Sequence, residues 1–429
     1  MSIRQHRDFV RIWSGQAVSN IGDGVHRIAV LWWARQATGS NLAVVAVALA
    51  TTVPTILAAP FAGWAVDRWD RRRLMVAADA ARVVTSGIIA LLAASGHLHL
   101  WMVLVLAAIA AVAGAVFSPA YMASITMLVP ADDRAVANSM VGTNEAIAGI
   151  LGPAVGGLLI GLWGTGSALW FDAATFVVSL LFVLASRVPM PVRDTTGEGA
   201  DGADGGILAG LSLLRKDRNL RDLTAVAVGL NTFAAPIPVL IVALAAGTLA
   251  LGGTGYGLLE AAIPAGLVVG FVVAPRLVTR RAAALVALIA TGSAIALAGA
   301  TAIAVAAGAA FVAAGVGIGV ANTVLPTRFQ QDVDPGIQGR IFALLGALMQ
   351  VGRPLGLVLA APLVGIIGPR GGLAVCGGAM LAVTFIGRRG LLGPVPVAGA
   401  AAATSEGLVQ ATEVTSGPAA PDLAGTAPA

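Results

Sequence analysis

The feature of this sequence that most limits its fold is a series of twelve apolar runs, each long enough for a helix that crosses a membrane. Such a helix needs about 20 mostly apolar residues. We expect the first six spans at 9–36, 41–66, 73–95, 100–122, 138–162 and 167–186. We expect the other six at 220–247, 255–275, 282–305, 307–327, 341–365 and 371–388. The sequence therefore predicts an all-α membrane protein with 12 transmembrane helices in two pseudo-symmetric six-helix bundles.

The composition agrees with immersion in lipid. Hydrophobic residues make up 58% of the chain and charged residues 11%, whereas soluble domains are about 25% charged. A soluble fold of this length would lack the polar side chains to cover its surface. The net charge of +5 does not indicate a nucleic-acid partner, because the basic residues lie in short loops and form no continuous patch.

Polar segments divide the chain into two halves. The stretch 188–218 is rich in Gly and Asp and cannot support a core, so we expect a cytoplasmic linker between halves at 1–187 and 219–389. The segment 390–429 is rich in Ala, Pro, Gly and Thr, which predicts a disordered cytoplasmic tail. In both halves a Pro/Asp turn ending in Arg precedes a helix with Pro-x-x-Gly. Duplicated halves around a central cavity are a common plan of transporters.

The distribution of basic residues predicts the orientation. With the N-terminus inside, 21 of the 26 basic residues lie in cytoplasmic segments and only Arg35 and Arg370 lie outside. By the positive-inside rule, both termini are expected in the cytoplasm of a multi-pass protein of the cell inner (plasma) membrane.

The sharpest motif lies at the end of the second span. A cluster of arginines alone is what positive-inside topology predicts, but a Gly followed by Asp four residues later and Arg five later is more specific. The segment resembles the signature Gly-x-x-x-Asp-Arg-x-Gly-Arg-Arg of the major facilitator superfamily, with Asp70 in place of the second Gly. The matching residues are Gly63, Asp67, Arg68, Arg71 and Arg72.

The resemblance implies the twelve-helix fold of that superfamily and a lock of the cytoplasmic gate made by these residues. Asp79 and Arg82, in the third span, are candidates for the same charge network. The corresponding place in the second half keeps Arg280 and Arg281 but lacks the Asp. The implied lock therefore has its acidic residue in the first half only.

A second motif lies in the fifth span. Glycines at 149, 152 and 156 predict a small-residue stripe on one helix face, where a neighbouring helix can approach closely. The segment is also similar to the antiporter motif of drug-exporting members of the superfamily, although an upstream Gly of that motif is Ala148 here. The matching residues are Gly152, Pro153, Gly156 and Gly157. Segments 19–23, 117–120 and 171–173 resemble the macrolide-efflux-like branch.

Charged and polar residues within the spans are the candidates for function. A charge at mid-span costs about 2.5–3.5 kcal/mol on insertion scales, so a functional role is the default hypothesis. Asp23 and Arg27 are four residues apart and are expected to pair on one helix face; the alternative is that this pair only holds the helix in the bundle. We expect His26 to be a packing residue and Asp172 to cap a helix or contact a neighbour. The further candidates are Asn144, Glu145, Glu260 and Arg353.

An ion gradient is the expected energy source, because the chain has no Gly-x-x-x-x-Gly-Lys-Ser/Thr phosphate loop. A carboxylate in a low-dielectric cavity can exchange a proton near neutral pH, since burial disfavours its charged form. Asp23, Glu145 and Glu260 are therefore alternative candidates for proton coupling, and Arg27 and Arg353 for anion contact or for neutralising these acids. No cofactor or metal site is expected; the one cysteine excludes a CxxC site.

These observations favour a secondary active transporter over an enzyme, since the sequence has no His-Glu-x-x-His or Gly-x-Ser-x-Gly motif at membrane depth. Together with the resemblance, they predict proton-coupled efflux of an amphipathic drug or secondary metabolite by alternating access. The alternative is an importer of a nutrient or siderophore-like molecule on the same fold. We expect a monomer whose partners are its small-molecule substrate and the lipid bilayer.

Overall fold

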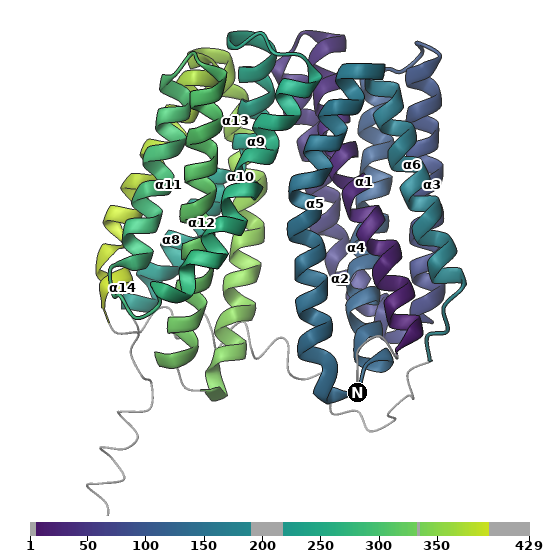
Figure 1. Cartoon of the computed structure of the whole chain (residues 1–429), viewed down its shortest axis with the longest axis horizontal. Coiled ribbons are helices and arrows are strands. Elements are labelled where there is room, and N and C mark those ends of the chain that lie inside the picture. The colour runs from purple at the N-terminus through teal and green to yellow at the C-terminus, as the bar shows by residue number, and fades with distance from the viewer. Residues whose placement is uncertain (1–5, 190–217, 333–334, 394–429) are drawn as a thin grey trace, which may run out of the picture.

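The computed structural model describes residues 6–189, 218–332 and 335–393. Most of the predicted linker and most of the predicted tail lie outside these residues. The regular elements within them are all helices. Figure 1 shows two helical bundles side by side, one from each half of the chain, with their helices roughly parallel.

The first bundle contains six long helices, each joined to the next by a short turn. They are α1 (Arg7–Thr38), α2 (Asn41–Arg68), α3 (Arg71–Ala94), α4 (Leu100–Leu128), α5 (Arg134–Trp163) and α6 (Thr165–Leu184). The second bundle is made of α8 (Arg218–Ala234), α9 (Ile237–Ala243), η3 (Leu244–Thr248), α10 (Gly253–Val273), α11 (Ala283–Ala300), α12 (Ala304–Asp332), α13 (Pro335–Ile386) and α14 (Arg388–Leu392).

The predicted all-α fold with twelve spans is confirmed. In the described part of the chain, ten helices are long and apolar enough to cross a membrane. Helix α1 is not among them, because charges such as Asp23 and Arg27 lower its hydropathy, yet its 32 residues are long enough to span. Helix α13 contains the last two predicted spans, which are separated at Gly368, where φ is 73°.

One predicted span is interrupted. The run 220–247 was expected to form one continuous helix, but α8 ends at Ala234 and α9 begins at Ile237. Pro236 lies at this break; it has no N–H to donate to the helix, and its ring disfavours helical backbone in the residue before it. Broken helices at membrane depth are typical of transporters, because they bring backbone groups to a central cavity.

Short turns with local caps fix the antiparallel order of the first bundle. Gly39 ends α1 in the left-handed region with φ of 66°, and the Ser40 side chain accepts a hydrogen bond from Leu42 N at the start of α2. The Asp70 carboxylate accepts from Arg72 N and Arg73 N at the start of α3. Asp70, which replaces a Gly of the superfamily signature, is therefore the N-cap of α3, a role that typically contributes about 1 kcal/mol.

The apolar core shows how the two bundles meet. One cluster joins them near the α1–α2 turn; it includes Trp32 and Val44 of the first bundle and Leu240 and Leu244 of the second. Two further clusters each belong to a single bundle and lie toward the other end, which holds the start of α1 and which we call the N-terminal end. Within the described residues, the bundles therefore share an apolar core at the α1–α2 end but not at the N-terminal end.

Candidate functional site

A cavity of about 600 Å³ lies between the two bundles. Its walls come from α1–α4 and α6 of the first bundle and from α9 and α13 of the second, and Ala235 adds a residue from the break between α8 and α9. Most lining residues are Ala, Val, Leu or Thr. The charged lining residues are Asp23, Arg27, Arg82 and Arg353, and His26 and Gln350 are the other strongly polar ones.

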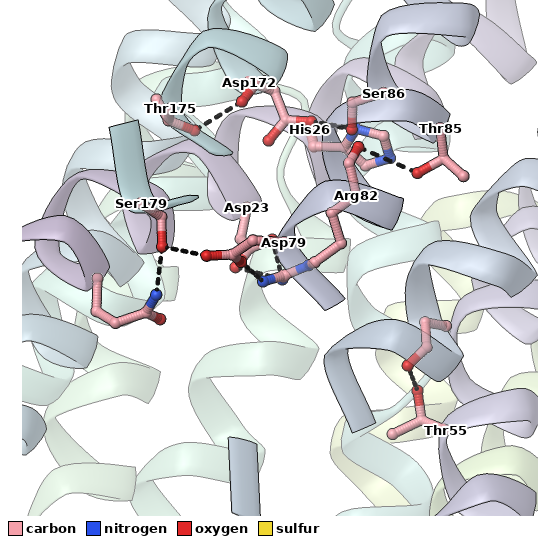
Figure 2. A network of polar contacts seen from close by, with 12 residues as sticks. Asp23, His26, Thr55, Asp79, Arg82, Thr85, Ser86, Asp172, Thr175 and Ser179 are labelled. Atoms are coloured by element: carbon pink, nitrogen blue, oxygen red, sulfur yellow. Dashed lines mark hydrogen bonds and ion pairs between the residues drawn. The ribbon is translucent and has the colours of Figure 1, made fainter. Parts of the chain in front are cut away.

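Asp23 on α1 pairs with Arg82 on α3. A single guanidinium nitrogen of Arg82, Nη2, donates to both carboxylate oxygens of Asp23, at 2.7 and 2.9 Å (Figure 2). The Arg82 guanidinium also lies over the ring of Phe176 on α6, 4.2 Å from its centroid. The predicted pairing of Asp23 with Arg27 is wrong, because the partner that reaches Asp23 comes from a neighbouring helix.

Arg27 instead points toward the second bundle. Its Nη1 lies 3.7 Å from Oε1 of Glu260 on α10, so this ion pair links the two halves. The Glu260 side chain is 4% exposed, while that of Arg27 is 45% exposed. Close by, Trp32 of α1 stacks on Tyr256 of α10 with ring centroids 5.3 Å apart.

Asp79, on α3 like Arg82, belongs to the same polar network (Figure 2). The Ser179 hydroxyl donates to Asp79 Oδ2 at 2.6 Å, and Gln16 Nε2 donates to Ser179 Oγ at 2.7 Å. Asp79 Oδ1 lies 3.9 Å from Arg82 Nη1. Asp79 and Arg82 were expected to be candidates for the gate network, but the structure places both in the interior network that holds Asp23.

His26 and Asp172 form a second polar pair. His26 Nδ1 lies 2.8 Å from Oδ2 of Asp172 on α6, and the Ser86 hydroxyl donates to the same oxygen at 2.7 Å (Figure 2). Asp172 is fully buried, whereas His26 is 14% exposed and lines the cavity. The expectation that His26 only packs is wrong; the expectation that Asp172 contacts a neighbour is confirmed.

Asn144 and Glu145 lie beside a smaller pocket of about 130 Å³. This pocket shares Asp23 and Arg82 with the main cavity. The Asn144 amide donates to Trp13 O at 3.2 Å, and Glu145 is exposed. The structure thus brings Glu145 to the neighbourhood of the Asp23–Arg82 pair.

The gate motif lies at the N-terminal end of the first bundle. Asp67 and Arg68 are exposed, and the Arg68 guanidinium lies over the Trp64 ring. Arg71 donates to Ala123 O on α4 at 3.0 Å, and Arg72 donates to Leu184 O, the last residue of α6, at 2.6 Å. The two arginines therefore join helices of one bundle, as basic residues near helix C-termini often do. The role of the motif in closing a gate stays a prediction.

The glycines of the antiporter-like motif are sites of close helix packing. A Cβ on Gly152 would lie 2.7 Å from Gly24 Cα, and one on Gly156 would lie 2.8 Å from Ile28 Cδ1, so both glycines face α1. A Cβ on Gly157 would lie 2.6 Å from Gly257 Cα of the second bundle. The predicted stripe is thus split. Gly149 faces Pro264 of α10, whereas Gly152 and Gly156 face α1.

Two helical bundles around a cavity with ionisable groups at membrane depth define a membrane transporter rather than an enzyme. The Major Facilitator Superfamily model matches residues 12–357. The chain belongs to this family.

Curated relatives cover most of the chain. The chain is 32% identical over 370 residues to the multidrug efflux pump Tap of Mycobacterium tuberculosis, which covers 80% of this chain and 83% of Tap. It is 24% identical over 362 residues to macrolide efflux protein A of Streptococcus pyogenes, covering 82% and 88%. These similarities support the macrolide-efflux-like branch of the superfamily.

Solved structures share the fold. The nucleoside transporter NupG superposes with a TM-score of 0.68 at 13% identity, covering 89% of this chain and 98% of NupG. A bacterial homologue of the iron transporter ferroportin, in an inward-facing state, superposes with a TM-score of 0.67 at 17% identity, covering 91% and 100%. At these identities the likeness concerns the fold alone.

Proposed function

We propose that this transporter exports amphipathic organic molecules in exchange for protons, by alternating access. The observation that carries this proposal is the cavity between the bundles, with the Asp23–Arg82 ion pair on its wall. The efflux functions in the names of the relatives support the direction of transport.

The cavity suits an amphipathic cargo. Its volume of about 600 Å³ lies within the range of small-molecule sites, about 300–1,000 Å³. Most of its wall is apolar, with a few charged groups that can orient a ligand. A sugar would need many more hydrogen-bonding side chains.

Asp23 is the first candidate for the proton-binding group. Its side chain is 42% exposed, so it can exchange protons with the cavity. A proton on Asp23 removes the charge that holds Arg82, and the guanidinium then interacts more strongly with Asp79, whose Oδ1 is 3.9 Å away. Arg82 therefore takes different positions when Asp23 is protonated and when it is charged, and cargo can occupy the space beside Arg82 in only one of these two protonation states. Proton binding and cargo binding are coupled in this way. Glu145 and Glu260 are the alternative proton-binding groups.

We propose that alternating access is a rocking motion of the two bundles. The bundles are held together near the α1–α2 end by the shared core, the Trp32–Tyr256 stack and the Arg27–Glu260 pair. Among the described residues, no apolar cluster joins the bundles at the N-terminal end, so we propose that the cavity opens at that end in this state. With positive-inside topology, that end faces the cytoplasm.

The return to the outward-facing state would break the contacts at the α1–α2 end and bring the N-terminal ends together. In that state, we expect Asp67 and Arg68 to contact the second bundle, as the gate motif of the superfamily implies. The close contact of Gly157 with Gly257 is a candidate pivot, because no side chains lie between the two backbones.

A drug-susceptibility panel that includes macrolides, in a hypersensitive host, tests this proposal. We expect the protein to lower drug accumulation, and a proton uncoupler to abolish the effect. Asp23→Asn should remain in the membrane and lose about ten-fold or more of the efflux rate, as expected when a proton-transfer group is removed.

The matched control is Asp132→Asn, which removes an exposed carboxylate in the turn before α5. It should leave efflux unchanged. Normal efflux by Asp23→Asn would remove Asp23 from the mechanism. Higher accumulation in cells that contain the protein would favour the importer.

A further inference from the structure

The charges that line the central cavity are unequal in sign. Three are positive, Arg27, Arg82 and Arg353, and one is negative, Asp23. Arg82 is balanced by Asp23, and Arg27 is balanced by Glu260 in the wall behind it. Arg353 is left as the uncompensated cation.

No ion pair or hydrogen bond joins Arg353 to any residue that the structure describes. It lies on α13, about halfway between Pro335 and the break at Gly368, and so near the middle of its span. Its side chain is exposed to the cavity. Arg27, a cation of the first bundle, lines the same cavity and has the same sign.

An unpaired charge at this depth is costly unless water or a counter-charge stabilises it. Water can solvate Arg353 while the cavity is open. When the bundles close around a cargo, that water is displaced, and the guanidinium then needs an anionic partner. Because Arg27 belongs to the first bundle and Arg353 to the second, an anion held by both would favour the closed arrangement.

We infer that Arg353, together with Arg27, binds an anionic group of the cargo, so that the preferred cargo is an amphipathic organic acid. A planar guanidinium matches carboxylate, sulfonate and phosphate groups, to which it can donate two parallel hydrogen bonds. The apolar wall of Ala, Val and Leu residues then holds the rest of the molecule. This inference rests on the proposed function, since it names the class of molecule that the exporter carries.

Two dyes with one xanthene scaffold provide a direct test. Fluorescein is anionic and rhodamine 123 is cationic, so their affinities for the purified full chain in detergent can be compared by fluorescence polarisation. We expect fluorescein to bind about ten-fold or more tightly than rhodamine 123, and its binding to weaken when the salt rises from about 50 to about 300 mM.

Variants locate the site. Arg353→Gln should weaken fluorescein binding about ten-fold or more, because a hydrogen bond to a charged group is lost, and should leave rhodamine 123 binding unweakened. Arg353→Lys should retain part of the affinity, because it keeps the charge but not the planar fork. The matched control is Arg276→Gln, which removes an exposed positive charge outside the cavity and should change neither affinity. A single sharp peak in size-exclusion chromatography verifies that each variant is folded.

Tighter binding of rhodamine 123 by the wild type, absence of fluorescein binding, or equal effects of Arg353→Gln and Arg276→Gln would each overturn the inference. Efflux assays distinguish a failure of the organic-acid inference from a failure of the proposed export function. If cells with the protein expel rhodamine 123 in a proton-dependent way but not fluorescein, the exporter proposal stands and the organic-acid preference falls.

Discussion

At the residue scale, the packing of the helices determines which charged side chains form ion pairs, and spacing along one helix does not. Asp23 and Arg27 are four residues apart and were expected to pair, yet Asp23 binds Arg82, 59 residues away, and Arg27 approaches Glu260. The sequence indicated that these charges matter, because each lies in an apolar run. It could not indicate their partners, since these depend on which helices are neighbours and on how each is rotated.

The buried network around Asp172 gives a prediction for stability. Asp172 is fully buried, and one of its oxygens accepts from Ser86 at 2.7 Å. Ser86→Ala should lower stability by about 1–3 kcal/mol, the cost of removing a partner from a buried polar group. Thermal unfolding in detergent should therefore show a lower Tm. Ser139→Ala, at an exposed position of α5, should leave Tm unchanged; equal Tm values for the two variants would contradict the network.

At the element scale, apolar runs and turn residues predicted nearly all of the spans. The break between α8 and α9 was missed, because Pro236 lies inside an apolar run of ordinary length. The packing partners of the fifth span were also missed. A stripe of small residues indicates close approach, but not that Gly157 faces the second bundle while Gly152 faces α1.

The contact between α5 and α10 predicts opposite effects for two glycine substitutions on one helix. Both Gly142→Ala and Gly157→Ala gain helix propensity, worth about 1 kcal/mol. A Cβ at Gly142 meets no atom within 4 Å, so we expect this variant to be as stable as the wild type or more so. A Cβ at Gly157 would overlap α10, so we expect a net loss, because overpacking costs about 1–3 kcal/mol.

Thermal unfolding and efflux should be measured together for these two glycine variants. We expect Gly157→Ala to lower both Tm and the efflux rate. If Gly157→Ala matched Gly142→Ala in both measurements, the close contact of α5 and α10 would not exist in the working protein.

The break in α13 depends on a left-handed backbone. Gly368 has φ of 73°, whereas nearby Gly365 lies within regular helix, and a Cβ on either would meet open space. Gly368→Ala should therefore destabilise the protein by about 1–2 kcal/mol, the cost of a left-handed residue with a side chain. Gly365→Ala should not. A Tm for Gly368→Ala at or above that of Gly365→Ala would show that this turn has a different conformation.

At the scale of the whole molecule, the sequence predicted two halves and an orientation but not the state of the cavity. The direction of opening depends on where the halves share a core. The shared cluster contains residues such as Trp32 and Leu240, and the separate clusters contain Phe9 and Ala284. All of these residues are apolar, so the sequence alone cannot distinguish those of the shared cluster from those of the separate clusters.

Labelling with a membrane-impermeant maleimide tests this arrangement. Ser118 lines the cavity, and Trp163 is exposed at the end of α5 that lies near the α1–α2 turn. Without a proton gradient, Ser118→Cys should react in everted vesicles and Trp163→Cys in intact cells. The native Cys376 is buried and should react in neither. Reaction of Ser118→Cys only in intact cells would place the opening on the other side.

Uptake into everted membrane vesicles tests the central claim most directly, because their acidic interior drives an exporter to accumulate its cargo. The cargo is the drug whose toxicity the protein reduces most in the susceptibility panel. We predict accumulation by the wild type, loss of accumulation when an uncoupler removes the gradient, and no accumulation by Asp23→Asn. Accumulation that persists with the uncoupler, or a gradient that drives the drug out of the vesicles, would contradict proton-coupled export.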